Sequence, residues 1–81
     1  MTILVRYFGP AREAVGLEEE SLTVGKGVTV SEVRSALLQQ HPELAFIAEA
    51  SRFAVNMKYS ADNEPVPEGA EFAIIPPVAG G

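Results

Sequence analysis

The sequence predicts a single α+β domain, in which a mixed sheet of four to five strands carries one main helix on one face. Two observations support this class. Several short segments rich in β-branched and aromatic residues alternate between apolar and polar positions, as strands do. Only the segment 29–40 repeats apolar residues at the spacing of a helix long enough to cover a sheet. The 81 residues are the length of one domain.

The strands are predicted from this alternation. The first runs over 2–8, the second over 20–24, the third over 52–57 with a short strand at 58–60, and the last over 71–75. Successive side chains point to opposite faces of a strand, so each strand has one face for the core. The inward positions of strands and helix form the predicted core: Ile3, Val5, Tyr7, Leu22, Val24, Val33, Leu37, Val55, Phe72 and Ile74.

The main helix has clear signals at both ends. Thr29 and Glu32 fit a capping box, in which each side chain bonds to the other residue's backbone N–H. Pro42 ends the helix, and we expect a structural role for His41 beside the helix C-terminus. The apolar stripe of the helix consists of Val30, Val33, Leu37 and Leu38.

Shorter segments connect these elements. Pro10 can open a short helix over 11–15, and Gly16 is placed to end it. The segment 61–69 is rich in turn residues. The segment 42–51 is predicted to be a loop or a short helix, anchored by Leu44, Phe46 and Ile47.

The first and last strands are the most apolar, which predicts that they lie side by side and parallel in the sheet centre. With the helix on one face, this is the β-grasp arrangement, and it leaves the other face open. The alternation places Leu4, Phe8 and Ile75 on that open face. Because clustered exposed apolar side chains often mark an interaction site, we expect these three to bind a partner protein.

Composition excludes several classes of function. The chain has no cysteine, which excludes disulfides and thiolate metal sites, and one histidine, which excludes a Ser-His-Asp triad and a His-rich metal site. A net charge of −5 with six scattered basic residues is a poor match for nucleic acid. No apolar stretch is long enough to cross a bilayer, and no signal peptide is evident, so we expect a cytoplasmic protein. No metal or bound cofactor is expected.

The last six residues form the most informative segment, since they follow a core strand directly. We therefore expect a domain over 1–75 and an extended tail over 76–81. Prolines stiffen the start of this tail, and glycines without a Cβ let its tip enter a narrow channel. Six extended residues reach about 20 Å. The tail would deliver a terminal carboxylate at Gly81 into another protein, and its other residues are Pro76, Pro77, Val78, Ala79 and Gly80.

Four features together resemble the small subunit of molybdopterin synthase, the MoaD family of ubiquitin-like sulfur carriers. They are the Gly-Gly ending, the segment 8–16 with its F-x-x-x-R-E-x-x-G pattern, Asn56 within Ala54-Val55-Asn56, and the run 68–77. The resemblance covers the whole chain. The sequence departs from the family at Ala70 and Ala79, where family members often have Asp and Ser or Thr.

The resemblance implies a chemistry at Gly81. An E1-like enzyme would use ATP to adenylate the Gly81 carboxylate, and a sulfur donor protein would convert the adenylate to a thiocarboxylate. The loaded tail would enter the large subunit, in an expected heterotetramer, and give its sulfur to cyclic pyranopterin monophosphate (precursor Z). The carrier would not be catalytic alone.

Three alternatives remain open from the sequence. The chain could be a sulfur carrier for thiamine, cysteine or tRNA thiolation, which share the fold and the tail. It could be a protein modifier joined to lysines, or a binding domain in which the tail has no role. Arg12 and Glu13 receive no chemical role, although the segment that contains them favours the molybdopterin branch.

Overall fold

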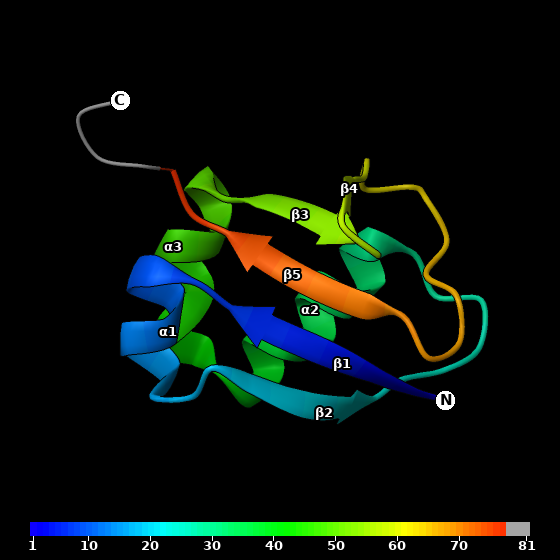
Figure 1. Ribbon diagram of the computed structural model, residues 1–81, viewed down its shortest axis with the longest axis horizontal. Coiled ribbons are helices and arrows are strands. Elements are labelled where there is room, and N and C mark those ends of the chain that lie inside the picture. The colour runs from blue at the N-terminus through cyan, green and yellow to red at the C-terminus, as the bar shows by residue number, and fades with distance from the viewer. Residues whose placement is uncertain (78–81) are drawn as a thin grey trace.

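The computed structural model describes residues 1–77, in which five strands form one sheet of order β2-β1-β5-β3-β4 (Figure 1). Strands β1 and β5 are parallel neighbours in the centre, and the other pairs are antiparallel. This confirms the predicted β-grasp topology. The strands are β1 Thr2–Tyr7, β2 Glu19–Thr23, β3 Arg52–Val55, β4 Lys58–Tyr59 and β5 Glu71–Ile75.

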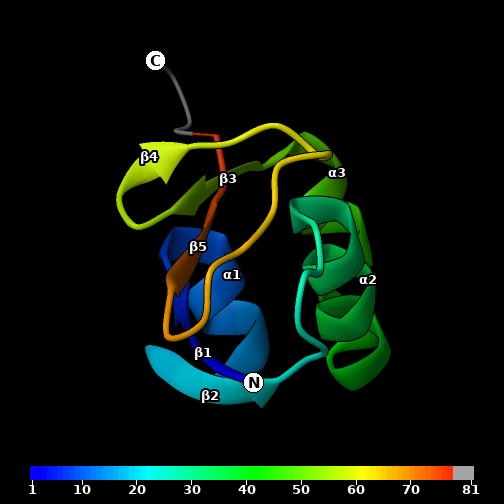
Figure 2. The same ribbon diagram turned by 90° about the vertical axis from the view of Figure 1, so that its right-hand side faces the viewer.

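Helix α2 lies across one face of the sheet, so that the domain has two layers (Figure 2). Its N-terminus carries the predicted capping box, because the Thr29 side chain accepts from the Glu32 backbone N–H and Glu32 accepts from the Thr29 N–H. Shorter helices cover the end of the domain where β5 finishes. The helices are α1 Gly9–Val15, α2 Val30–Gln40, the 3₁₀ helix η1 Pro42–Leu44 and α3 Ala45–Ala50.

The core fills the space between the sheet and the helices. Most of the predicted core is buried, but Val24 and Val55 are only half-buried and pack against the edge of the cluster. The predicted core list missed residues that become buried only through tertiary packing: Ala11, Ala48, Phe53, Val66 and Ala70.

Helix α3 corrects one prediction. Leu44 is buried and Ile47 is half-buried, as expected, but the Phe46 side chain is 85% exposed and anchors nothing. The helical period explains this, because Leu44, Ile47 and Ala48 share the inward face and Phe46 points the opposite way. Sequence alone left open whether 42–51 was helical, so it could not fix which side chain faced outward.

A partly buried polar contact joins β1, β2 and the end of α2. The Tyr7 hydroxyl donates to Glu20 Oε1 at 2.5 Å, and His41 Nε2 contacts the same carboxylate oxygen. The His41 ring also meets the Tyr7 ring edge to face, with centroids 6.0 Å apart. His41 therefore has structural partners, as the sequence predicted.

The β3–β4 turn fixes one edge of the open face. Asn56 and Met57 both have positive φ, at 50° and 70°, which is the conformation of a tight two-residue hairpin. Asn56 also bonds to the start of β5, since its N–H donates to the Glu71 carbonyl and its Oδ1 accepts from the Glu71 N–H. The turn is thus held beside the central strands.

Candidate functional site

The tail begins at the end of β5, beside α1 and α3 (Figure 1). Pro76 is half-buried and Pro77 is exposed, so the first two tail residues already leave the core. The other predicted tail residues, Val78, Ala79, Gly80 and Gly81, lie outside the described residues. The part of the tail that the structure describes is therefore its root.

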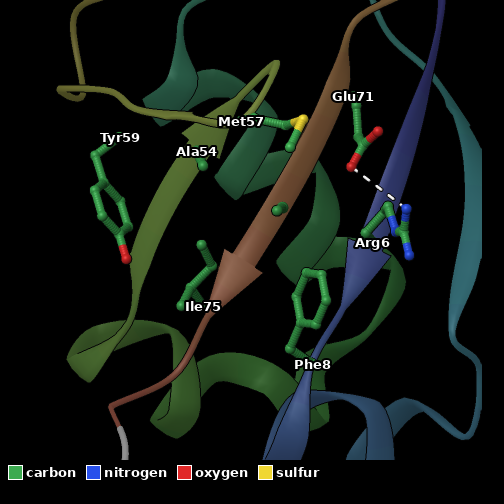
Figure 3. Close-up of a pocket in the computed structure, with 8 residues that line it drawn as sticks. Arg6, Phe8, Ala54, Met57, Tyr59, Glu71 and Ile75 are labelled. Atoms are coloured by element: carbon green, nitrogen blue, oxygen red, sulfur yellow. Dashed lines mark ion pairs between the residues drawn. The ribbon is translucent and has the colours of Figure 1, made fainter.

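A hollow lies next to this root, on the sheet face that α2 leaves uncovered. The strand register places Ala73 opposite Arg6 on one side and Ala54 on the other, and Ala54 opposite Tyr59. Because the side chains of Ala54 and Ala73 are short, they form a low floor between the larger side chains of Arg6 and Tyr59. The resulting hollow has a volume of about 330 Å³ and is also lined by Phe8, Met57, Glu71 and Ile75 (Figure 3).

The rim of this hollow is apolar and strongly exposed. Phe8 is 42% exposed, Tyr59 is 55% exposed and Met57 is 88% exposed, while Ile75 is half-buried between them. Figure 3 shows Phe8 and Ile75 on one side and Met57 and Tyr59 around the rest. Single exposed apolar residues are common, but exposed apolar side chains gathered around one concave surface often mark an interaction site.

Two arginines flank the apolar rim. Arg6 Nη1 lies 3.6 Å from Glu71 Oε1, and the Arg6 guanidinium is 5.7 Å from the Phe8 ring centroid. The Arg52 guanidinium lies 3.7 Å from the Tyr59 ring centroid, which is a close cation–π contact. Within residues 1–77, no carboxylate pairs with Arg52. The edge of the apolar open face therefore carries the Arg6–Glu71 ion pair and the guanidinium of Arg52.

The structure brings together two of the three residues that the sequence assigned to partner binding. Phe8 and Ile75 line the hollow, whereas Leu4 lies farther along β1, pairs with Glu71 and Ser21, and does not line it. Sequence reasoning missed Ala54, Ala73, Met57 and Tyr59. Alternation along the last strand could have placed Ala73 on the same face as Ile75. The position of Met57 could not be predicted in this way, because it depends on the geometry of the hairpin turn.

The side chains of Tyr7, Glu20, His41 and Glu43 form a titratable cluster that lies against the core. Burial, and then the bond and charge of Glu20, raise the pKa of Tyr7 far above its ordinary value, so this hydroxyl stays protonated. Among residues 1–77, no group of His, Asp and Glu side chains is arranged to hold a metal ion. No helix in that range is long and apolar enough to span a membrane.

A family model described as the ThiS family matches residues 5–81, which includes the open face and the whole tail. The molybdopterin synthase sulfur carrier subunit of Chlamydomonas reinhardtii is 35% identical, and the match covers 100% of both chains. The corresponding subunit of Mycobacterium tuberculosis is also 35% identical, over 95% of this chain and 94% of its own.

Solved structures agree with this match. SAMP1 from Haloferax volcanii superposes with a TM-score of 0.90 at 25% identity, over the full length of both chains. A complex of subunits 1 and 2 of the molybdopterin-converting factor from Helicobacter pylori contains a chain with a TM-score of 0.73 at 27% identity, again over both full lengths. The resemblance seen in the sequence is confirmed, and the chain belongs to the ThiS family.

Proposed function

We propose that this protein is the sulfur carrier subunit of molybdopterin synthase, with the Gly81 carboxylate as the group that carries sulfur. One observation carries the proposal. The match to molybdopterin synthase sulfur carrier subunits runs over the whole of both chains, through the Gly-Gly tail that follows central strand β5. In this division of labour residues 1–75 form the body and residues 76–81 the tail.

The chemistry requires an activated carboxylate. An oxygen of the Gly81 carboxylate attacks the α-phosphorus of ATP in an E1-like enzyme, which releases pyrophosphate and leaves an acyl-adenylate. A persulfide of the sulfur donor then attacks the carbonyl carbon and AMP leaves, which gives an acyl disulfide. A thiol then attacks the donor sulfur of that disulfide, which releases the Gly81 thiocarboxylate and leaves a disulfide between the thiol and the donor. Because the chain has no cysteine, none of its side chains competes for the sulfur.

The second half of the reaction takes place in the large subunit. The thiocarboxylate sulfur attacks cyclic pyranopterin monophosphate, and hydrolysis returns the Gly81 carboxylate. Two carriers are needed for the two sulfurs of the dithiolene, which fits a heterotetramer. The body of the carrier supplies no acid or base for these steps, so the residues that activate the substrate belong to the large subunit.

The open face gives the body a place to dock while the tail is inserted. Phe8 and Ile75 line the hollow next to the tail root, so a partner that takes the tail can cover both at once. The E1-like enzyme and the large subunit both have to take the tail. We propose that they share this face and therefore bind one at a time.

Removal of the terminal glycine tests the proposal. A variant that lacks Gly81, and a variant with one alanine added after it, should keep the fold, because the tail follows the last strand. Both should lose adenylation, measured as ATP–pyrophosphate exchange with the E1-like enzyme, and both should fail to support molybdopterin formation. Full activity of the unprocessed, extended variant would refute the role of Gly81.

A second candidate function has support from the likeness to SAMP1 of Haloferax volcanii, which is named a small archaeal modifier protein. A modifier would use the same adenylate but transfer Gly81 to a lysine amine. The two functions differ in their products. Covalent conjugates of higher mass in cell extracts, retained under reducing conditions, would favour the modifier, whereas a thiocarboxylate without conjugates favours the sulfur carrier.

A further inference from the structure

A second apolar groove lies on the other side of the tail root. It has a volume of about 230 Å³, and it is formed where α1 and α3 meet the end of β5. Ile75 faces the hollow on the open face, whereas Pro76 and Pro77 line this α3 groove. The tail root therefore separates two apolar surfaces. The remaining lining residues are Pro10, Phe46, Ile47 and Ala50.

Phe46 is the dominant side chain of the α3 groove. Its 85% exposure leaves nearly the whole ring in water, although burial of a phenylalanine typically contributes about 1.5–3 kcal/mol. The inward face of α3 is already filled by Ile47 and Ala48, so the ring cannot join the core. The exposed ring is available for contact with another protein, where aromatic side chains in a protected centre contribute much of the binding energy.

Two exposed carboxylates lie on the short helices that form the α3 groove. Glu13 lies three residues after Pro10 on α1, and Glu49 lies three residues after Phe46 on α3, so each is a helical neighbour of a lining residue. Neither carboxylate forms an ion pair among residues 1–77. The two helices that form the apolar α3 groove therefore each carry a carboxylate that has no ion-pair partner among residues 1–77.

We propose that the α3 groove is a second docking surface for the large subunit, with Phe46 as its anchor. The inference rests on the proposed function. A protein that takes the tail end-on has to surround its root, and the root is bordered by the hollow on one side and the α3 groove on the other. In the proposed reaction the tail tip meets an anionic phosphorylated substrate inside the large subunit, so Lys and Arg belong near the site that the tail enters. Those side chains would face Glu13 and Glu49.

The test measures binding of the full-length carrier to the large subunit by isothermal titration calorimetry. Phe46→Ala should raise the Kd by at least tenfold, because it removes a central aromatic anchor. The matched control is Leu17→Ala, since Leu17 is also an exposed apolar side chain, at 43%, and lines neither groove. The control should bind within twofold of the original protein. The double variant Glu13→Gln, Glu49→Gln should slow association by roughly threefold at low salt and much less at high salt.

The possible outcomes separate the inference from the proposed function. If the unaltered carrier binds the large subunit and Phe46→Ala binds equally well, the α3 groove is not part of that interface and the inference is wrong. A loss seen only with the E1-like enzyme, or a Phe46-dependent homodimer in sedimentation, would also overturn it by naming another occupant. If the unaltered carrier does not bind the large subunit at all, the proposed function fails and the inference fails with it.

Discussion

Filling the hollow on the open face gives a sharp test of how the carrier docks. Ala73 lies at the floor of the hollow, between Arg6 and Ala54 in the strand register. The substitution Ala73→Leu adds three carbon atoms to that floor. The space above it is about 330 Å³ and is open to solvent, so the larger side chain can occupy the hollow without entering the core beneath the sheet.

The magnitude follows from what the added side chain displaces. If the partner places an apolar side chain on the alanine floor, Ala73→Leu excludes it and removes about 1.5–3 kcal/mol of burial. Since 1.4 kcal/mol corresponds to a tenfold change, the Kd should rise by about tenfold to a hundredfold. The cost in folding should stay under about 1.5 kcal/mol, because the site is not closely packed on its outer side.

The assay is calorimetric titration with the large subunit, accompanied by urea denaturation of each variant. Ala61→Leu is the matched control, because Ala61 is exposed in the connection after β4 and lines neither groove. The control should bind normally. A stable Ala73→Leu variant that binds as tightly as the control would refute docking on the alanine floor.

Three further predictions concern the core, the buried tyrosine and the rim of the hollow. Leu37→Ala should destabilise the fold by about 2–5 kcal/mol, because Leu37 is 1% exposed in the core; urea denaturation showing a loss under about half a kcal/mol would contradict this. Tyr7 keeps its proton when folded and loses it above about pH 10 when unfolded, so stability should fall with rising pH by up to about 1.4 kcal/mol per unit. The Tyr7→Phe variant should lack this extra slope in urea denaturation between about pH 9 and pH 11.5, and equal slopes would refute the assignment. Phe8→Lys should weaken binding to the E1-like enzyme and to the large subunit while folding is nearly unchanged, and normal binding to both would exclude the open face.

Most of the fold could be predicted from short-range sequence signals. Three short-range features each indicate one structure. They are the capping box at Thr29, the helix end at Pro42 and the apolar first and last strands. They placed α2 and the parallel central pair correctly. The boundaries of β2 and α1 moved by one or two residues, because strand ends and short helices depend on neighbours that the sequence does not reveal.

The site was harder to predict where it depends on tertiary contacts. Alternation placed Phe8 and Ile75 on the open face, since the period of a strand is regular. It could not show that Ala54 and Ala73 meet across two strands to form a floor, because that depends on strand register. The orientation of Phe46 depended on α3 being a helix, and the short segment alone did not settle this.

Gly81 is the residue proposed to carry sulfur, and intact mass spectrometry detects that modification without any other readout. The full chain would be incubated with the E1-like enzyme, MgATP and sulfide, and its C-terminal peptide would then be sequenced by fragmentation. We expect a mass gain equal to the difference between one sulfur and one oxygen atom, located at Gly81 and absent without ATP. An unchanged mass with an active enzyme, or a sulfur located at any other residue, would contradict it.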